Sequence, residues 1–111
     1  MDLTTVKSIY RETAEYANKE VTIGGWIRTM RASKHFGFIE LNDGSFFKNI
    51  QVVFEADKVS NYEEITKQNV GAALIVKGLL VETPEAKQPF EIKATEIEVE
   101  VINHLCKIYG Y

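Results

Sequence analysis

Aromatic side chains occupy alternate positions in residues 36–41, a short segment with the composition of a β-strand. Successive strand residues point to opposite faces, so Phe36, Phe38 and Glu40 form one set. Glu40 does not belong in an apolar interior, and this set should therefore face outward. An exposed aromatic ring offers a π-face on which a nucleobase can stack.

A second segment of this kind, residues 49–54, follows the turn sequence Asn42–Ser45. Its inward set is apolar, which leaves Gln51 in the outward set. Pairing across the turn places Gln51 on the same face as Phe38, either directly or diagonally adjacent. Because an amide both donates and accepts hydrogen bonds, the two side chains have the chemistry to stack on a base and read its edge.

The chain has a net charge of −3, yet basic side chains gather next to this face. Residues 24–38 contain no acid and four basic residues, which are Arg28, Arg31, Lys34 and His35. Glutamates instead dominate residues 82–100. A local positive field can steer a polyanion such as single-stranded RNA, because salt screens the more distant charges beyond about 10 Å. Taken alone, the charge pattern is equally typical of a solvated charged face.

The main alternative for the aromatic residues is that other parts of the chain cover them. An N-terminal helix or the loop at residues 31–35 would then pack over the rings. The pattern slightly favours this cover for Phe36 and slightly disfavours it for Phe38. Only a residue left open to solvent can stack on a base.

Strand and helix patterns alternate along the chain and define the elements that must present this face. Helical spacing predicts a helix over residues 5–17, and the capping-box spacing of Ser60 and Glu63 predicts another that ends near residues 69–71. The glycine pair 24–25 predicts a β-bulge or a sharp bend at which the strand turns a barrel corner, and a change of parity near residues 95–96 predicts a second bulge. Strands are expected over residues 21–30, 36–41, 49–54, 72–82 and 90–102.

The predicted order along the chain is a leading helix, three strands, a second helix and two further strands. This order predicts an all-β fold with short helices. The order is that of the OB-fold, a five-stranded Greek-key barrel with a helix between strands three and four. OB-folds bind oligonucleotides on strands two and three and through their loops, although other small barrels remain possible on topology alone. We expect one domain over residues 1–102 and a C-terminal tail over residues 103–111.

Several classes of protein are disfavoured by what the 111 residues lack. No segment approaches the roughly 20 apolar residues that cross a bilayer, and residues 1–5 lack the pattern of a secretion signal. Cys106 is the only cysteine, which fits a reducing, cytoplasmic setting. His104 and Cys106 have no second pair of zinc ligands, and neither a phosphate-binding glycine loop nor a nucleophile elbow occurs. We expect no catalytic residue, metal or cofactor in this chain.

Residues 21–31 are similar to the first-strand signature of the anticodon-binding domain of class II aspartyl- and asparaginyl-tRNA synthetases. Residues 33–45 and 49–53 resemble asparaginyl-tRNA synthetases specifically. The likeness extends over residues 6–102, nearly the whole chain. The resemblance implies that the chain binds the anticodon loop of an Asn-type tRNA. It implies no membrane partner.

The resemblance also implies roles for four residues. Phe38 matches the aromatic residue that stacks on the middle anticodon base, a uracil in both Asp and Asn anticodons, and Gln51 matches the glutamine that reads this base. Arg31 matches an arginine that contacts the anticodon loop. Glu91 matches a glutamate near the first anticodon base. The choice of asparaginyl over aspartyl rests on resemblance, because the two anticodons differ only at the third base.

Synthetases of this family continue into a larger catalytic domain, which binds ATP and Mg²⁺ and forms a homodimer. Its signature segments do not occur in these 111 residues, so we expect tRNA binding without aminoacylation. The chain is then either an excised or truncated N-terminal domain or a free-standing relative. Two other functions stay open: a non-specific single-strand-binding OB module, and a regulatory relative that no longer binds RNA.

Overall fold

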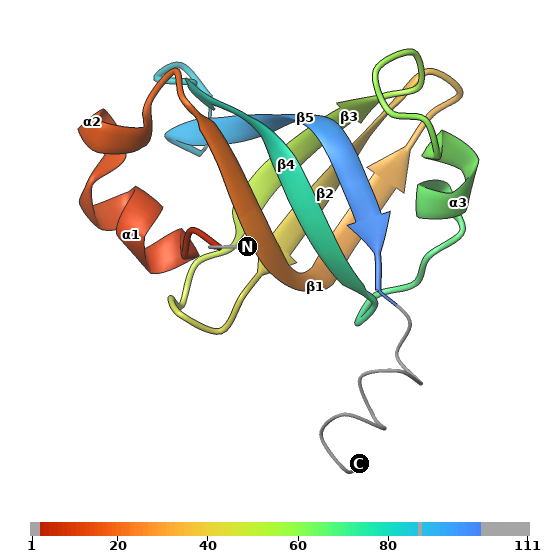
Figure 1. Cartoon of the computed structure of the whole chain (residues 1–111), viewed down its shortest axis with the longest axis horizontal. Coiled ribbons are helices and arrows are strands. Elements are labelled where there is room, and N and C mark those ends of the chain that lie inside the picture. Colours follow the sequence, from red (N-terminus) through yellow and green to blue (C-terminus); the bar gives the residue numbers. More distant parts are fainter. Residues whose placement is uncertain (1–2, 87, 101–111) are drawn as a thin grey trace, which may run out of the picture.

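Five strands form a closed barrel in the structure, a computed structural model that describes residues 3–86 and 88–100. The strand order is β1-β2-β3-β5-β4, and only the β3–β5 pair is parallel. This is the Greek-key topology of the OB-fold, which confirms the predicted fold class (Figure 1). The strands are β1 (Glu20–Ala32), β2 (Phe36–Asn42), β3 (Ile50–Glu55), β4 (Ala73–Glu82) and β5 (Phe90–Val99).

The first four strands begin and end within two residues of their predicted bounds. The last strand ends at Val99, short of its predicted end near residue 102, which itself lies outside the described residues. So does the predicted tail over residues 103–111, with His104 and Cys106.

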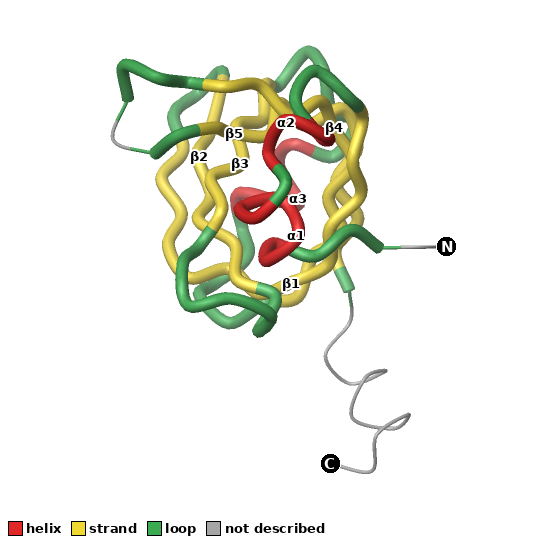
Figure 2. The backbone as a smooth tube through the Cα atoms, turned by 90° about the vertical axis from the view of Figure 1, so that its left-hand side faces the viewer, coloured by secondary structure: helices red, strands yellow, loops and turns green. Residues whose placement is uncertain are grey.

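Helices close the two ends of the barrel. Figure 1 shows α1 (Val6–Arg11) and α2 (Thr13–Tyr16) at one end and α3 (Tyr62–Thr66) at the other, and Figure 2 looks onto the α1 end, with strands around the helix. The apolar side chains of Ile9 and Ile65 are fully buried against the barrel core. Covering both ends removes apolar surface from water and leaves the outer faces of the strands free.

The predicted helix over residues 5–17 is wrong in one respect, because it breaks at Glu12 into α1 and α2. The Thr13 hydroxyl donates to the carbonyl of Ile9 at 2.8 Å. That carbonyl would accept the backbone N–H of Thr13 if the helix continued, so the side chain replaces the helical bond. A local side-chain bond thus overrides the apolar periodicity.

The predicted capping box of the second helix is also wrong. The cap residue of α3 is Asn61, whose side chain makes no capping hydrogen bond. Its amide instead donates to the carbonyl of Ile97 in β5 at 2.9 Å and to the carboxylate of Glu64 at 2.9 Å. The tertiary bond to β5 determines where α3 begins, and α3 ends at Thr66, before the predicted residues 69–71.

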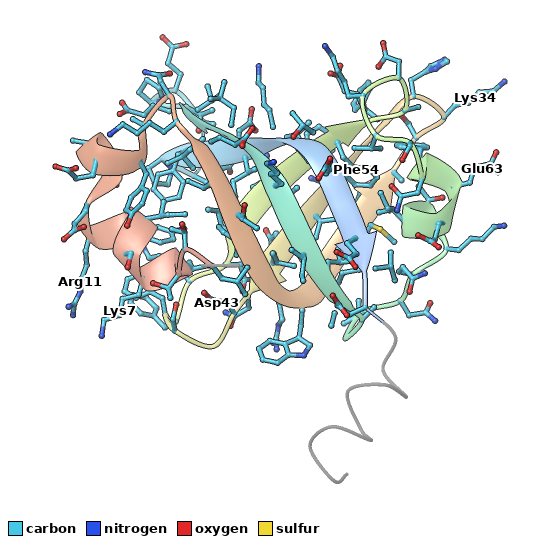
Figure 3. The ribbon with its side chains drawn as sticks, viewed as in Figure 1. Lys7, Arg11, Lys34, Asp43, Phe54 and Glu63 are labelled. Atoms are coloured by element: carbon cyan, nitrogen blue, oxygen red, sulfur yellow. The ribbon has the colours of Figure 1, made fainter. Side chains whose placement is uncertain are left out.

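The β2–β3 turn holds the start of α1. The carboxylate of Asp43 accepts the backbone N–H of Val6 at 2.9 Å, and the Ser45 hydroxyl accepts that of Lys7 at 3.1 Å. These N–H groups have no partner within the helix, so the turn supplies the missing acceptors. Figure 3 shows Asp43 beside the first turn of α1. The bonds keep α1 at this end of the barrel.

The bulge in β1 does not fall at the glycine pair 24–25, where a bulge or a sharp bend was predicted. The register with β2 shifts between Ile27 and Thr29, so Arg28 is the extra residue. Gly25 serves a different purpose, since a Cβ there would lie 2.6 Å from the carbonyl oxygen of Asn42. The glycine permits close backbone contact where β1 passes from β4 to β2.

The predicted bulge near residues 95–96 is confirmed. Lys77 pairs with Glu96 but Gly78 pairs with Ala94, which leaves Thr95 as the extra residue of β5. The Thr95 hydroxyl donates to the carbonyl of Lys77 at 3.1 Å. Because of the bulge, the apolar residues of β5 before and after it both point into the barrel.

Gly78 faces this bulge so closely that a side chain has no room. A Cβ at this position would lie 2.4 Å from the carbonyl oxygen of Lys93 and 2.8 Å from the Cα of Ala94. We expect Gly78→Ala to lower the free energy of unfolding by about 1–3 kcal/mol, because backbone atoms must move. Urea denaturation measures this loss.

Gly24→Ala is the matched control, because its Cβ would meet the flexible Leu3 side chain at 3.1 Å rather than backbone. It should change the free energy of unfolding by less than about 1 kcal/mol. Equal losses in the two variants would contradict the close approach at Gly78.

Candidate nucleic-acid interface

The outer face of β2 and β3 carries the predicted aromatic and amide side chains. Phe38 pairs with Val53 and Glu40 pairs with Gln51. Phe38 and Gln51 are therefore on one outward face, as the alternation predicted, and of the two predicted arrangements the structure shows the diagonal one. The residues that follow them along their strands, Ile39 and Val52, are fully buried in the core. Burial of one set of side chains thus forces the other set outward.

A row of four side chains crosses this face from strand to strand. Arg31 pairs with Phe38, which pairs with Val53, which in turn pairs with Lys93 of β5. The Arg31 guanidinium carbon lies 6.0 Å from the centre of the Phe38 ring. Within the described residues neither Arg31 nor Lys93 forms a salt bridge. The row therefore presents an aromatic and an aliphatic side chain between two exposed cations.

Lys93 was not among the predicted site residues. Its alternation within β5 indicates that it points outward, but nothing local shows which strand lies beside it. The parallel β3–β5 pairing places it next to Val53, and this contact is between residues far apart in sequence. Sequence reasoning could have found Lys93 only by assuming the full strand order of an OB-fold.

Phe36 is 45% exposed, so the interpretation that a helix or loop covers it is wrong. α1 is anchored at the opposite end of β2, by the turn that follows this strand. The β1–β2 loop bends toward α3, where the Tyr62 hydroxyl donates to the carbonyl of Ser33 at 2.7 Å. The Phe36 ring contacts that of half-buried Phe38 edge to face, with centres 5.7 Å apart. The two rings form one aromatic surface.

A second, polar row lies beside the first. Gln51 pairs with Glu91 across the β3–β5 ladder, and the Gln51 amide nitrogen donates to a Glu91 carboxylate oxygen at 3.1 Å. Both side chains are half-buried. On the other side of Gln51, the Glu40 carboxylate accepts from the Asn49 amide at 3.4 Å. The rows combine a stacking surface with oriented hydrogen-bonding groups.

Tyr10 of α1 holds the start of β3 through a hydrogen bond. Burial, and to a smaller degree the Glu40 carboxylate, raise the pKa of Tyr10 above its usual value. The phenol therefore stays protonated at neutral pH, and its hydroxyl donates to the carbonyl of Asn49 at 2.8 Å. This bond ties α1 to the residue directly before β3, the strand that carries Gln51.

The other predicted site residues lie around this surface. Lys34 and His35 are exposed in the β1–β2 loop, and Lys34 extends away from the barrel in Figure 3. Arg28 is exposed in the β1 bulge and pairs with no residue of β2. The structure thus brings Arg31, Phe36, Phe38, Gln51 and Glu91 together on one surface, while Arg28, Lys34 and His35 lie outside its paired rows.

No helix among residues 3–86 and 88–100 is long and apolar enough to cross a membrane. In the same residues no group of three or more His, Cys, Asp or Glu side chains is placed to hold a metal ion.

Residues 21–100 match the tRNA anticodon family, which is described as an OB-fold nucleic acid binding domain. The match covers more than half of the chain, all five strands of the barrel except Glu20 at the start of β1, and both rows of the surface. The chain belongs to this family of OB-fold nucleic acid binding domains.

Its curated relatives are asparagine–tRNA ligases, which confirms the resemblance. The chain is 62% identical over 100 residues to that of Acetivibrio thermocellus, covering 90% of this chain and 22% of the relative. It is 63% identical over 99 residues to that of Clostridium perfringens, covering 89% of this chain and 21% of the relative. The chain thus spans about a fifth of the length of these relatives.

Among solved structures, asparaginyl-tRNA synthetase from Pyrococcus horikoshii, complexed with asparaginyl-adenylate, has the same fold. The TM-score is 0.76 at 20% identity, over 89% of this chain and 22% of that chain.

The outward position of Phe38 has a consequence for stability. We expect Phe38→Ala to lower the free energy of unfolding by less than about 1.5 kcal/mol, because the ring is only half-buried. Phe54→Ala should cost about 3–5 kcal/mol, since Phe54 is fully buried inside the barrel. Urea denaturation of both variants measures the difference, and equal losses would contradict the outward orientation of Phe38.

Proposed function

We propose that this chain recognises the anticodon of a tRNA as the anticodon-binding part of an asparagine–tRNA ligase. The row Arg31–Phe38–Val53–Lys93 carries the proposal, because it places an accessible aromatic ring between two cations on the strands that bind oligonucleotides in OB-folds. The family match and the names of the relatives support the choice of tRNA over other nucleic acids.

In this proposal the Phe38 ring stacks on the middle anticodon base. Arg31, whose guanidinium carbon lies 6.0 Å from the centre of the same ring, pairs with a neighbouring phosphate or base. Lys93 contacts the RNA backbone from the opposite side of the row. Stacking contributes about 1–3 kcal/mol per base, and each phosphate contact adds a salt-dependent term. The net charge of −3 does not oppose this binding locally, because no acid lies in the row.

The polar row supplies the base-edge contacts. Gln51 offers an amide to the middle base, which we propose to be a uracil, and Glu91 offers a carboxylate to the first base. A carboxylate only accepts hydrogen bonds, so Glu91 suits a base edge that carries N–H donors. Phe36, Lys34 and His35 line the approach from the β1–β2 loop, with Arg28 further along β1. These outer residues position the loop through stacking and phosphate contacts rather than by reading sequence.

The wider proposal concerns the whole ligase. This chain supplies anticodon binding, whereas aminoacylation, with its ATP and Mg²⁺, belongs to the part of such a ligase that this chain does not cover. We propose that the whole ligase is an ATP-dependent homodimer that works in the cytoplasm. The Asn-type anticodon is proposed from the two relatives described above, both of which are asparagine–tRNA ligases.

Phe38→Ala tests the stacking contact. We expect the variant to bind an Asn-type anticodon stem-loop more weakly by about 1–3 kcal/mol, because the ring's stacking area is lost. Fluorescence anisotropy with a labelled stem-loop at low salt measures the affinity. The same titration with stem-loops altered one base at a time tests recognition of the anticodon.

Two results would contradict the proposal. Equal affinity of the unaltered chain for a polypyrimidine strand and for the stem-loop would indicate a non-specific single-strand-binding module. Absence of any salt-dependent binding would indicate a relative that does not bind RNA. An unchanged affinity in Phe38→Ala would remove this residue from the interface.

Lys93→Gln tests the cationic edge of the row. The plot of log affinity against log salt should become shallower by roughly one unit or slightly less, because one phosphate contact no longer releases a counterion. Lys67→Gln is the matched control, since Lys67 is exposed but follows α3, away from the row. Titrations at several salt concentrations measure both slopes, and an equal change in the two variants would place Lys93 outside the interface.

A further inference from the structure

We infer that Glu91 positions the Gln51 amide in one orientation, and that this orientation makes the site accept uracil and reject cytosine at the middle base. The inference rests on the proposed function, and it assigns Glu91 a positioning role in addition to its own contact with RNA. It follows from one hydrogen bond and from the chemistry of its two partners.

The hydrogen bond runs from the Gln51 amide nitrogen to a carboxylate oxygen of Glu91, at 3.1 Å. The two residues are direct partners in the parallel β3–β5 ladder, so their backbones hold the side chains side by side. Glu91 also pairs with Val81 of β4, which fixes its strand from the other side. Both side chains are half-buried. The geometry therefore belongs to the barrel and not to a flexible loop.

The chemistry of the pair allows only one orientation of the amide. An ionised carboxylate accepts hydrogen bonds and donates none, so only the NH₂ end of Gln51 can face Glu91. A rotation by 180° would bring the Gln51 carbonyl oxygen against the carboxylate, and two acceptors repel each other. The Gln51 carbonyl oxygen and the second N–H of its amide remain available to a ligand.

Glu40 does not impose an orientation in the same way. It lies directly opposite Gln51 across the β2–β3 ladder, but its carboxylate accepts from the amide of Asn49. Gln51 is therefore flanked by two carboxylates of equal charge, and only one of them holds the amide. This difference provides a matched pair for mutagenesis.

Uracil and cytosine present opposite patterns to such an amide. Uracil carries an acceptor at position 4 and an N–H donor at position 3, whereas cytosine carries an amino donor at position 4 and an acceptor at position 3. A glutamine that rotates freely can satisfy either base by turning over. A glutamine held by Glu91 pairs with only one of the two patterns, which under the proposed function is that of uracil. Cytosine at the same position would then lose its hydrogen bonds to the amide.

Glu91→Gln is the test variant, because it keeps the size of the side chain and can face either end of the Gln51 amide. Affinities are measured by anisotropy for two Asn-type stem-loops that differ only in uracil or cytosine at the middle position. We expect the unaltered chain to prefer uracil, and the ratio of the two affinities to fall by roughly fivefold to tenfold in Glu91→Gln.

Glu40→Gln is the control, since it removes the same charge beside Gln51 without touching the hydrogen bond to Glu91. It should raise the affinity for both stem-loops and leave their ratio unchanged. The inference is overturned if the ratio of the uracil and cytosine affinities is unchanged in Glu91→Gln, or if it falls equally in Glu40→Gln. Failure of the unaltered chain to bind either stem-loop overturns the proposed function instead.

A measurement without RNA examines the positioning directly. In the free chain, the two side-chain N–H protons of Gln51 should give well-separated ¹⁵N-correlated resonances, with one shifted by its bond to Glu91. In Glu91→Gln this separation should shrink toward that of an exposed glutamine, while the backbone spectrum shows that the barrel is intact. Resonances of an exposed, unbonded amide in the unaltered chain would also overturn the inference.

Discussion

β3 and β5 lie 40 residues apart in sequence at the point where Gln51 meets Glu91, and three parallel pairs hold them together. This contact closes the barrel. Without it, β3 and β5 would each present an open edge, and the outer face would end at Val53 and Gln51. With it, both rows of the surface continue onto β5, where they gain Lys93 and Glu91. The candidate interface is therefore a product of closure.

Closure of the barrel also determines where the helices can pack. A closed barrel has two open ends and one continuous outer surface, and the apolar residues of α1 and α3 cover the ends. Asp43 and Ser45 keep α1 at its end, and Asn61 ties α3 to β5 at the other. Because the short helices are held at the ends, the outer faces of β2 and β3 remain open for a ligand.

Charge is arranged by the same geometry. The chain as a whole is acidic, but the row through Phe38 ends in a cation on each side. The carboxylates of Glu40 and Glu91 stand in the next row, one on either side of Gln51. Strand pairing thus separates a stacking row that suits phosphate from a polar row that suits base edges. A polyanion meets the cations while its bases reach Gln51 and Glu91.

The sequence alone determined the inside and outside of the barrel, because burial forces strand side chains to alternate and Glu40 marks the outer set. The fold class, the shared outward face of Phe38 and Gln51 and the bulge near Thr95 follow from that constraint and from turn chemistry. Only the tertiary structure decided the break of the first helix at Glu12, the cap of α3, the exposure of Phe36, and the pairing that brings Lys93 and Glu91 to the site. These features depend on contacts between distant segments, and local periodicity carries no information about which distant segment is the partner.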